Sequence, residues 1–370
     1  MGAGLRAAVS GDDGSRARVS RALESFHGSG RAILTDSGTT ALTLALKWCL
    51  ARTGRLKIAL PAFCCYDLVT ALHGSGGDVT FYDLDPATLG PDWNSLARAL
   101  EERPAALVVA HLYGLPVDMP RVLEMTEGTG VTVIEDAAQG SGATLHRRPL
   151  GSFGQLAVLS FGRGKGVTGG RGGALLVNAG WRGGSDESLL LPAKRGSGEL
   201  APLLAQWMLA RPALYRIPAS LPFLALGETV YRPPQRLRRM SSVSSAVVEV
   251  TWTEREAEIT RRQRNATTLL GEPGTSGAIA PIPGARPGWL RLPVLVENPA
   301  EPPEESLGVM RSYPVPLPAL PDLNRSTRPS SDFPGAVTLA TRLRTLPTHG
   351  MVSESVRARL GAGARAAFSA

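Results

Sequence analysis

The sequence predicts an α/β protein in which a mostly parallel, helix-covered sheet forms a large domain, followed by a smaller α/β domain. Its 370 residues are too many for one small module and fit one large and one small unit. Hydrophobic residues make up 43% and charged residues 19%, which is typical of globular chains and excludes global disorder. From about residue 31 to 178, short apolar runs alternate with amphipathic stretches, which is the pattern of such a sheet.

A polar lead and a short helix near Arg16–Phe26 precede the alternating region. A helix over Thr39–Leu50 places Leu42, Leu46 and Cys49 on one face. The last two apolar runs are separated only by a glycine-rich loop, which is too short for a helical crossover, so we expect them to pair antiparallel. The expected strands are Arg31–Leu34, Lys57–Leu60, Val79–Tyr82, Ala106–Ala110, Val131–Ile134, Leu156–Ser160 and Ala174–Val177.

The second half of the chain changes character after residue 179. We divide it into the end of a large domain, 1–240, and a small C-terminal domain, 241–370, joined by one long helix over about 243–270. Residues 200–226 are apolar but broken by arginines and prolines; we interpret them as a buried or subunit-facing helical excursion, with an interfacial membrane patch as the alternative. The small domain is expected to hold a strand at Leu290–Val296 and helices near Gly335–Leu343 and Ser353–Leu360.

The composition narrows the partners and the compartment. The net charge is +8, and only four of the 40 basic residues are lysines. The basic residues form neither a run of five or more nor a stripe interleaved with aromatic residues. We therefore expect no nucleic-acid binding and favour an anionic small molecule as the ligand. Three cysteines give neither a disulfide framework nor a zinc spacing, so we expect no metal and a reducing, cytoplasmic location. The amino end lacks the apolar core of a signal peptide, and no run of eighteen apolar residues predicts a membrane span.

Two candidate ligand segments follow expected strands, where open α/β sheets bind ligands. Ser37, Gly38 and Thr39 open the first helix of the sheet region, and first-turn amides with hydroxyl groups make an anion site; plain helix capping is the alternative. Asp136 ends a buried strand and Gln139 follows it. A buried carboxylate needs a partner, which is either a helix terminus or a cationic ligand nitrogen.

Lys165 lies in a glycine-rich loop between two expected strands, after Ser160. The loop does not match a phosphate-binding P-loop, because Leu159 and Gly166 stand where that motif needs Gly and Ser or Thr. A lysine that forms a Schiff base is the better interpretation, with a solvated loop lysine as the alternative. The neighbouring Arg163 is a cation that would favour the neutral amine.

The fourth segment is Phe63-Cys64-Cys65-Tyr66, whose soft and aromatic side chains suit the face of a planar ring, although core packing is favoured. Taken together, the four segments describe one ligand with a phosphate, a basic ring nitrogen, a ring oxygen and an aldehyde. That ligand is pyridoxal 5′-phosphate, which carries carbanion chemistry as an electron sink.

In their order, these segments resemble the DegT/DnrJ/EryC1/StrS family of sugar aminotransferases. The strong part of the resemblance covers about residues 30–178, with weaker similarity at Tyr313-Pro314 and near His349. The matching stretches are Ser37–Leu42, Leu60–Phe63, Phe81–Pro86, His111–Met119, Ile134–Gln139, Ser160-Phe161 with Lys165, and Gly172-Gly173.

The resemblance implies the fold type I of pyridoxal-phosphate enzymes, a homodimer, and amino transfer from glutamate to a keto group of a nucleotide-linked sugar. It implies that Lys165 is the Schiff-base lysine and proton shuttle, and that Asp136 partners the ring nitrogen. It places Gln139 at the ring hydroxyl. Cofactor contacts are expected at Ser37, Gly38, Thr39, Cys65, Tyr66 and Ser160, and substrate contacts at Arg163, Arg239, Tyr313 and His349.

Two departures from the family pattern bear on the site. The family's stacking aromatic residue is replaced by Cys65, and the Asn of a segment that reaches the partner's phosphate is absent from Leu237–Met240. Three alternatives stay open: a dehydratase, an amino transfer to a non-sugar ketone, and a non-catalytic relative that binds the cofactor. The retained Lys165 and Asp136 argue against the last of these.

Overall fold

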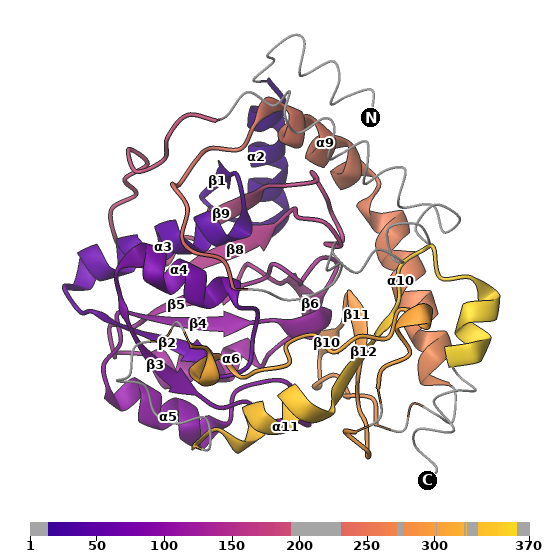
Figure 1. Ribbon diagram of the computed structural model, residues 1–370. Helices are drawn as coiled ribbons and strands as arrows, with labels where there is room; N and C mark the ends of the chain where they lie inside the picture. Colours follow the sequence, from indigo (N-terminus) through magenta and orange to yellow (C-terminus); the bar gives the residue numbers. More distant parts are fainter. Residues whose placement is uncertain are drawn as a thin grey trace.

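The central feature of the computed structural model is a seven-stranded sheet, with the C-terminal part of the chain lying along one side of it (Figure 1). The structure describes residues 14–193, 231–271, 275, 277–300, 302–321, 323 and 332–360. The apolar segment 200–226, for which the sequence predicts a helical excursion, lies outside the described residues. Among the described helices, none has both the length and the apolarity that crossing a membrane requires.

The strand order of the large sheet is β1-β9-β8-β5-β4-β2-β3. Strands β8, β5, β4, β2 and β3 are parallel, whereas β9 pairs antiparallel with both β8 and β1, which confirms the predicted sheet and its antiparallel pair. The central strands are apolar almost throughout because helices and loops cover both of their faces. The strands are β1 Arg31–Thr35, β2 Lys57–Pro61, β3 Asp78–Tyr82, β4 Ala106–Ala110, β5 Thr132–Asp136, β8 Leu156–Ser160 and β9 Gly173–Val177.

Helices of the first part of the chain begin where the sequence supplies a capping side chain. Ser37, Asp92 and Asp118 each accept a hydrogen bond from an amide in the first turn of the helix that follows. The helix predicted to open at Thr39 is therefore α3, one residue longer at its start. The helices are α2 Gly14–His27, α3 Gly38–Thr53, α4 Asp67–Ser75, α5 Trp93–Glu101 and α6 Met119–Thr126, with a 3-10 turn η1 at Leu112–Gly114.

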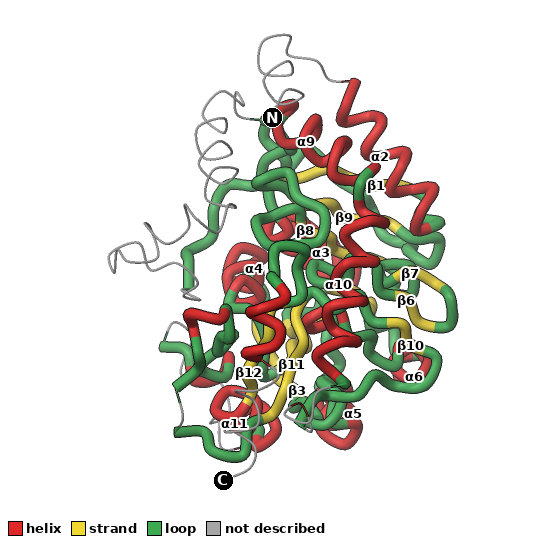
Figure 2. The backbone as a smooth tube through the Cα atoms, turned by 90° about the vertical axis from the view of Figure 1, so that its right-hand side faces the viewer, coloured by secondary structure: helices red, strands yellow, loops and turns green. Residues whose placement is uncertain are grey.

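The single long helix predicted over 243–270 is wrong in one respect, because it consists of two helices, α9 Ser242–Thr253 and α10 Arg255–Leu270. The side chain of Arg255 turns back and its Nη1 donates to the Trp252 carbonyl at 2.7 Å. The Arg255 guanidinium also lies over the rings of Trp252 and Phe26. A side chain that takes a carbonyl of the helical ladder interrupts the helix at that point. Helix α9 packs on α2, and α10 continues along the C-terminal part (Figure 2).

The C-terminal part contains a two-stranded antiparallel sheet of β11 Arg291–Leu295 and β12 Leu343–Pro347. Helix α11 (Pro334–Arg342) and a helical stretch at 354–360 accompany it, so the predicted strand and both helices are present. Strand β12 was not expected. Three short strands, β6 Thr144–Leu145, β7 Arg148–Pro149 and β10 Ala285–Arg286, pair beside the main sheet, and 3-10 turns lie at η4 Glu305–Leu307 and η5 Leu317–Ala319.

One carboxylate joins the large sheet to the C-terminal part. Asp83, just after β3, accepts hydrogen bonds from Gly335 N–H at 2.8 Å and Ala336 N–H at 2.7 Å. These amides belong to the first turn of α11, whose own N-cap, Phe333, makes no side-chain hydrogen bond. Asp83 therefore caps a helix that begins about 250 residues later in the chain, as the sequence separations of 252 and 253 record.

Candidate active site

The four segments singled out in the sequence lie at one edge of the large sheet. They follow the carboxyl ends of β1, β2, β5 and β8. These ends point the same way, because the central strands are parallel and β9 reverses the direction between β8 and β1. Ligands of open α/β sheets bind at this edge. The topology therefore gathers the predicted residues into one site.

The amino end of α3 lies against the end of β8. Ser37 Oγ caps the helix by accepting from Thr40 N–H at 3.0 Å. The first-turn amides of Gly38 and Thr39 have no partners within the helix. A Cβ atom on Gly38 would stand 3.0 Å from Ser160 Cβ, so the absence of a side chain permits this close approach. First-turn amides beside a hydroxyl group form a cradle that suits an anion.

Asp136 is the last residue of β5, and its carboxyl group lies within electrostatic reach of Lys165. Burial raises the pKa of Asp136, against the lowering effects of the Ala138 amide, which donates to it at 3.0 Å, and of the Lys165 charge. Burial also raises the pKa of the Cys64 and Cys65 thiols, and again the charge of Lys165 opposes it. The amine of Lys165 therefore lies among the ends of β2 and β5.

The loop that carries Lys165 is braced from outside the sheet. Thr251 Oγ1 on α9 donates to the Thr168 carbonyl at 2.8 Å. A Cβ atom on Gly169 would stand 2.7 Å from the Val248 side chain, so α9 presses directly on the loop. Lys165 itself is half-buried, and its Nζ makes no hydrogen bond or ion pair with the described residues. The loop is fixed while its amine is left available.

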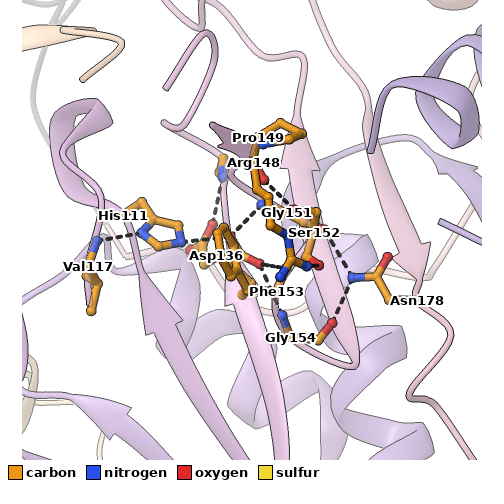
Figure 3. A network of polar contacts seen from close by, with 12 residues as sticks. His111, Val117, Asp136, Arg148, Pro149, Gly151, Ser152, Phe153, Gly154 and Asn178 are labelled. Carbon is orange, nitrogen blue, oxygen red and sulfur yellow. Dashed lines mark hydrogen bonds and ion pairs between the residues drawn. The ribbon is translucent and has the colours of Figure 1, made fainter. Parts of the chain in front are cut away.

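A buried network supports the strand end that carries Asp136 (Figure 3). Glu135, fully buried, accepts from His111 Nε2 at 2.9 Å and from the amides of Gly151 and Phe153, the latter at 2.9 Å. Although burial alone would raise the pKa of Glu135, these hydrogen bonds hold it below its usual value. His111 Nδ1 accepts from a backbone amide at 3.1 Å, so Nε2 carries the ring proton and donates it to Glu135.

Gln139 lies between two tyrosines at the same edge. Its Oε1 accepts from Tyr113 N–H at 3.0 Å, and its Nε2 donates to Tyr313 Oη at 2.9 Å. The ring of Tyr313 is stacked on Tyr113, with centroids 6.4 Å apart and planes at 23°, and meets Phe63 edge-on at 5.4 Å. Tyr66 also contacts Tyr313, with centroids 6.4 Å apart. Tyr313 thereby links the C-terminal part to the sheet edge.

The remaining expected contacts lie in different surroundings. Arg163 is exposed on the Lys165 loop. Arg239 Nη1 pairs with Glu187 Oε2 at 2.7 Å. His349 lies beside α10 and β11, and burial, together with the charge of Arg262, lowers the pKa of its imidazole. No interaction among the described residues connects these three side chains to the pair of Lys165 and Asp136.

Two residues of the site were not found from the sequence. Asp67 acts electrostatically on the site, since its charge raises the pKa of both Cys65 and Asp136. Its place directly after Cys65-Tyr66 is the signal that could have identified it. The other residue is Tyr113, which stands at a positive φ of 57° in η1 and gives its amide to Gln139. It lies in the stretch His111–Met119, whose only signal in the sequence is its resemblance to the family.

The arrangement fits the ligand deduced from the sequence. A free amine, a carboxyl group with one oxygen accepting a backbone amide, a fixed amide group and an anion cradle converge on one edge. The cradle is of the kind that a Cβ atom on Gly38 would fill. These are the groups required by an aldehyde, a basic ring nitrogen, a ring oxygen and a phosphate, respectively.

Comparison with known proteins gives a consistent result. The model of the DegT/DnrJ/EryC1/StrS aminotransferase family matches residues 12–181. An L-glutamine:2-deoxy-scyllo-inosose aminotransferase of Streptomyces kanamyceticus is 31% identical over 167 residues, which is 45% of this chain and 39% of the relative. A UDP-N-acetyl-3-dehydro-alpha-D-glucosamine 3-aminotransferase of Acidithiobacillus ferrooxidans is 33% identical over 153 residues, 41% of this chain and 40% of the relative.

The sequence similarity spans about 40% of the length of these relatives, whereas the fold is shared over nearly the whole chain. A DegT DnrJ EryC1 StrS aminotransferase from Brucella abortus superposes with a TM-score of 0.74 at 21% identity, covering 99% of this chain and 94% of that one. DesV of S. venezuelae, in complex with a ketimine intermediate, has a TM-score of 0.75 at 20% identity, covering 99% of this chain and 93% of that one. A GDP-4-keto-6-deoxymannose-3-dehydratase with bound GDP-perosamine has a TM-score of 0.74 at 16% identity, covering 98% of this chain and 96% of that one. The fold class predicted from the sequence is thereby confirmed.

Proposed function

We propose that this chain, whose residues 12–181 match the model of the DegT/DnrJ/EryC1/StrS aminotransferase family, is a pyridoxal 5′-phosphate-dependent aminotransferase acting on a ring ketone. The observation that carries the proposal is the proximity of an available Lys165 amine to the Asp136 carboxyl group at one sheet edge, where the charge of the amine acts on that carboxyl group. The family match supports the same conclusion independently of that geometry.

Each residue of the site has a definite task in this proposal. Asp136 holds a proton on the ring nitrogen through charge and hydrogen bonding. The amides of Gly38 and Thr39, with the Ser160 hydroxyl, bind the phosphate. When bound, pyridoxal 5′-phosphate supplies an aldehyde and an electron-withdrawing ring. Lys165 would hold the aldehyde through its amine, and the same amine, when free, would act as the base that moves the proton from Cα of the donor.

The electrostatics of the site favour this division of labour. Burial raises the pKa of Asp136, so in the free protein the ionised carboxylate is less favoured than it would be in water. A cationic ring nitrogen facing that carboxylate restores the ionised form, because an opposite charge nearby favours it. The buried Glu135, saturated by His111 and backbone amides, keeps the strand end in place without competing for the ligand.

Lys165→Ala tests the assignment. We expect the purified variant to lose the absorbance band of the lysine-bound cofactor, and its amino-transfer rate to fall by a factor of about a hundred or more, because both the attachment point and the general base are removed. Lys57→Ala is the matched control, since Lys57 begins β2 at the opposite end of the strand and pairs with Glu102. A Lys165→Ala protein that keeps the band and the rate would refute the proposal.

The acceptor and donor are proposed more narrowly as a nucleotide-linked keto sugar and glutamate, the pair implied by the family resemblance. The similarity to the UDP-sugar aminotransferase supports this acceptor. A second candidate is a cyclitol ketone with glutamine as donor, which the similarity to the inosose aminotransferase favours. Incubation with each acceptor and each donor, followed by mass analysis of the products, separates the two.

The same incubations test the non-aminating alternatives. A dehydrated product without nitrogen would favour the dehydratase alternative, which the structural likeness to the GDP-sugar dehydratase keeps in view. Failure of every amino donor to convert the bound cofactor into its amine form would favour the non-catalytic relative. A homodimer and a cytoplasmic location remain expectations; sedimentation of the cofactor-loaded protein tests the first of them.

A further inference from the structure

The orientation of the Gln139 side-chain amide is fixed by its neighbours. A backbone N–H can only donate, so the amide atom facing Tyr113 N–H at 3.0 Å must be the oxygen. The nitrogen Nε2 therefore faces Tyr313 Oη, 2.9 Å away. Gln139 cannot exchange the two ends of its amide without placing two donors against each other.

The nitrogen of Gln139 still has one hydrogen to donate. A side-chain amide carries two N–H groups, and only one of them is used by Tyr313. No acceptor for the second appears among the described residues. Gln139 stands three residues after Asp136 at the carboxyl end of β5, the edge at which the Lys165 amine lies. Its remaining N–H is thus available to an acceptor oxygen of a ligand bound there.

Tyr313 is placed to hold this amide. Its side chain is buried, with 8% of its surface exposed, and is enclosed by the rings of Phe63, Tyr66 and Tyr113. Burial raises the pKa of its hydroxyl well above the usual value, so the group stays neutral and accepts the Gln139 hydrogen bond.

We propose that Tyr313 is a positioning residue that acts through Gln139, fixing its amide so that the free N–H is donated to the ring oxygen of the cofactor. The inference rests on the proposed function, because it needs a phosphorylated pyridine ring in the site. It also gives the C-terminal part of the chain a task in cofactor binding, although Tyr313 lies 174 residues from Gln139 in the sequence.

Tyr313→Phe removes the hydroxyl and keeps the ring among its aromatic neighbours. We expect pyridoxal 5′-phosphate to bind the apoprotein about three- to tenfold more weakly, which is the range for one lost hydrogen bond. We also expect the pH midpoint of the bound-cofactor absorbance to rise, since a donor at the ring oxygen favours its ionised form. Tyr82→Phe is the control: its buried hydroxyl donates to the Val108 carbonyl at 2.8 Å, and its loss should leave both quantities unchanged.

A double-mutant cycle separates action through Gln139 from direct contact. If Tyr313 acts through Gln139, then adding Tyr313→Phe to Gln139→Leu changes neither the affinity nor the pH midpoint further. An equal effect of Tyr313→Phe in both backgrounds, or no effect in the wild-type background, overturns this inference and leaves the proposed function standing. A wild-type protein that binds no pyridoxal 5′-phosphate overturns the proposed function instead.

Discussion

The carboxyl group of Asp136 is held between opposing influences, and its charge depends on what faces it. Burial favours the protonated group, whereas the Ala138 amide and the Lys165 amine favour the ionised one. A ligand with a protonated ring nitrogen adds a second cation. The bound ligand would therefore favour the ionised form of Asp136. Such a shifted pKa is typical of carboxyl groups at functional sites.

Asp136→Asn should preserve the shape of the site and remove this charge. We expect kcat/KM for amino transfer to fall by a factor of about a hundred or more, because a neutral amide does not hold the proton on the ring nitrogen. Steady-state kinetics with saturating cofactor measure the effect. Asp118→Asn, at the cap of α6, is the control, and an equal loss in both variants would contradict the assigned role.

His27, at the end of α2, makes stability depend on pH. Burial lowers the pKa of His27 from 6.5 to about 4, despite the opposing charge of Glu135. It lines a cavity of about 50 Å3 together with Ser160, Trp252 and Arg255. Between about pH 4 and 6.5 the unfolded chain binds a proton at His27 that the folded chain does not. Stability therefore rises with pH across this window and is lost as the pH falls.

The contribution of His27 over that window is on the order of 3 kcal/mol. We expect His27→Gln to reduce the difference between the free energies of unfolding at pH 4.5 and pH 7.5 by an amount of that order. Urea unfolding at the two pH values gives the difference for each protein. Other titrating groups are common to both, so an unchanged difference would show that His27 does not have the proposed effect.

The sequence predicts which residues meet at the sheet edge better than it predicts the residues that support them. Lys165 and Asp136 could be predicted because each follows an apolar strand, and strand ends meet at one edge. The hydrogen bond between Gln139 and Tyr313 could not be predicted, because it spans 174 residues. The expected contacts at Ser37, Thr39, Cys65 and Tyr66 stay predictions, and Ser37 Oγ already serves the cap of α3.

Among the elements, α11 depends most on a residue outside itself. Asp83→Ala removes the acceptor for two amides of its first turn, so we expect the free energy of unfolding to fall by about 2 kcal/mol, more than a single lost cap. Urea unfolding measures the total, and hydrogen exchange at Gly335 and Ala336 should accelerate most. The physical cause is that both amides are buried and lose the acceptor that they have among the described residues.

Asp85→Ala provides the comparison for this element. Asp85 accepts only from its own turn, namely from Ala87 N–H at 2.9 Å and the Thr88 hydroxyl at 3.0 Å. Its loss should cost less than about 1 kcal/mol and leave exchange in α11 unchanged, because a surface turn tolerates such changes. Equal costs for the two variants would mean that Asp83 does not cap α11.

The elements themselves follow the sequence closely where local rules act alone. Every expected strand of the large sheet is present, because short apolar runs bounded by turn residues favour buried strands over other structures. The break between α9 and α10 escaped prediction because it depends on Arg255 bending back onto Trp252. Strand β12 escaped because it starts at Leu343, directly after α11, with no glycine or proline to mark the change.

For the whole molecule, ligand binding and stability should be linked. Pyridoxal 5′-phosphate added at a hundred times its Kd should raise the free energy of unfolding by about 2.7 kcal/mol. Because Tyr313 and Asp83 connect the two parts of the chain, we expect the gain in hydrogen-exchange protection to include the β11–β12 sheet. Protection confined to the edge formed by β1, β5 and β8 would contradict this connection.

The cap that Asp83 supplies also has a consequence for how the protein is made. A ribosome delivers the seven strands of the sheet by residue 177, together with the Lys165 loop, but the helix that Asp83 receives starts only at Pro334. Through the second half of translation the emerging polypeptide therefore lacks the two amides that Asp83 holds in the finished fold. We therefore expect chains truncated before Tyr313 to depend on chaperones, rather than on vitamin B6, for their survival.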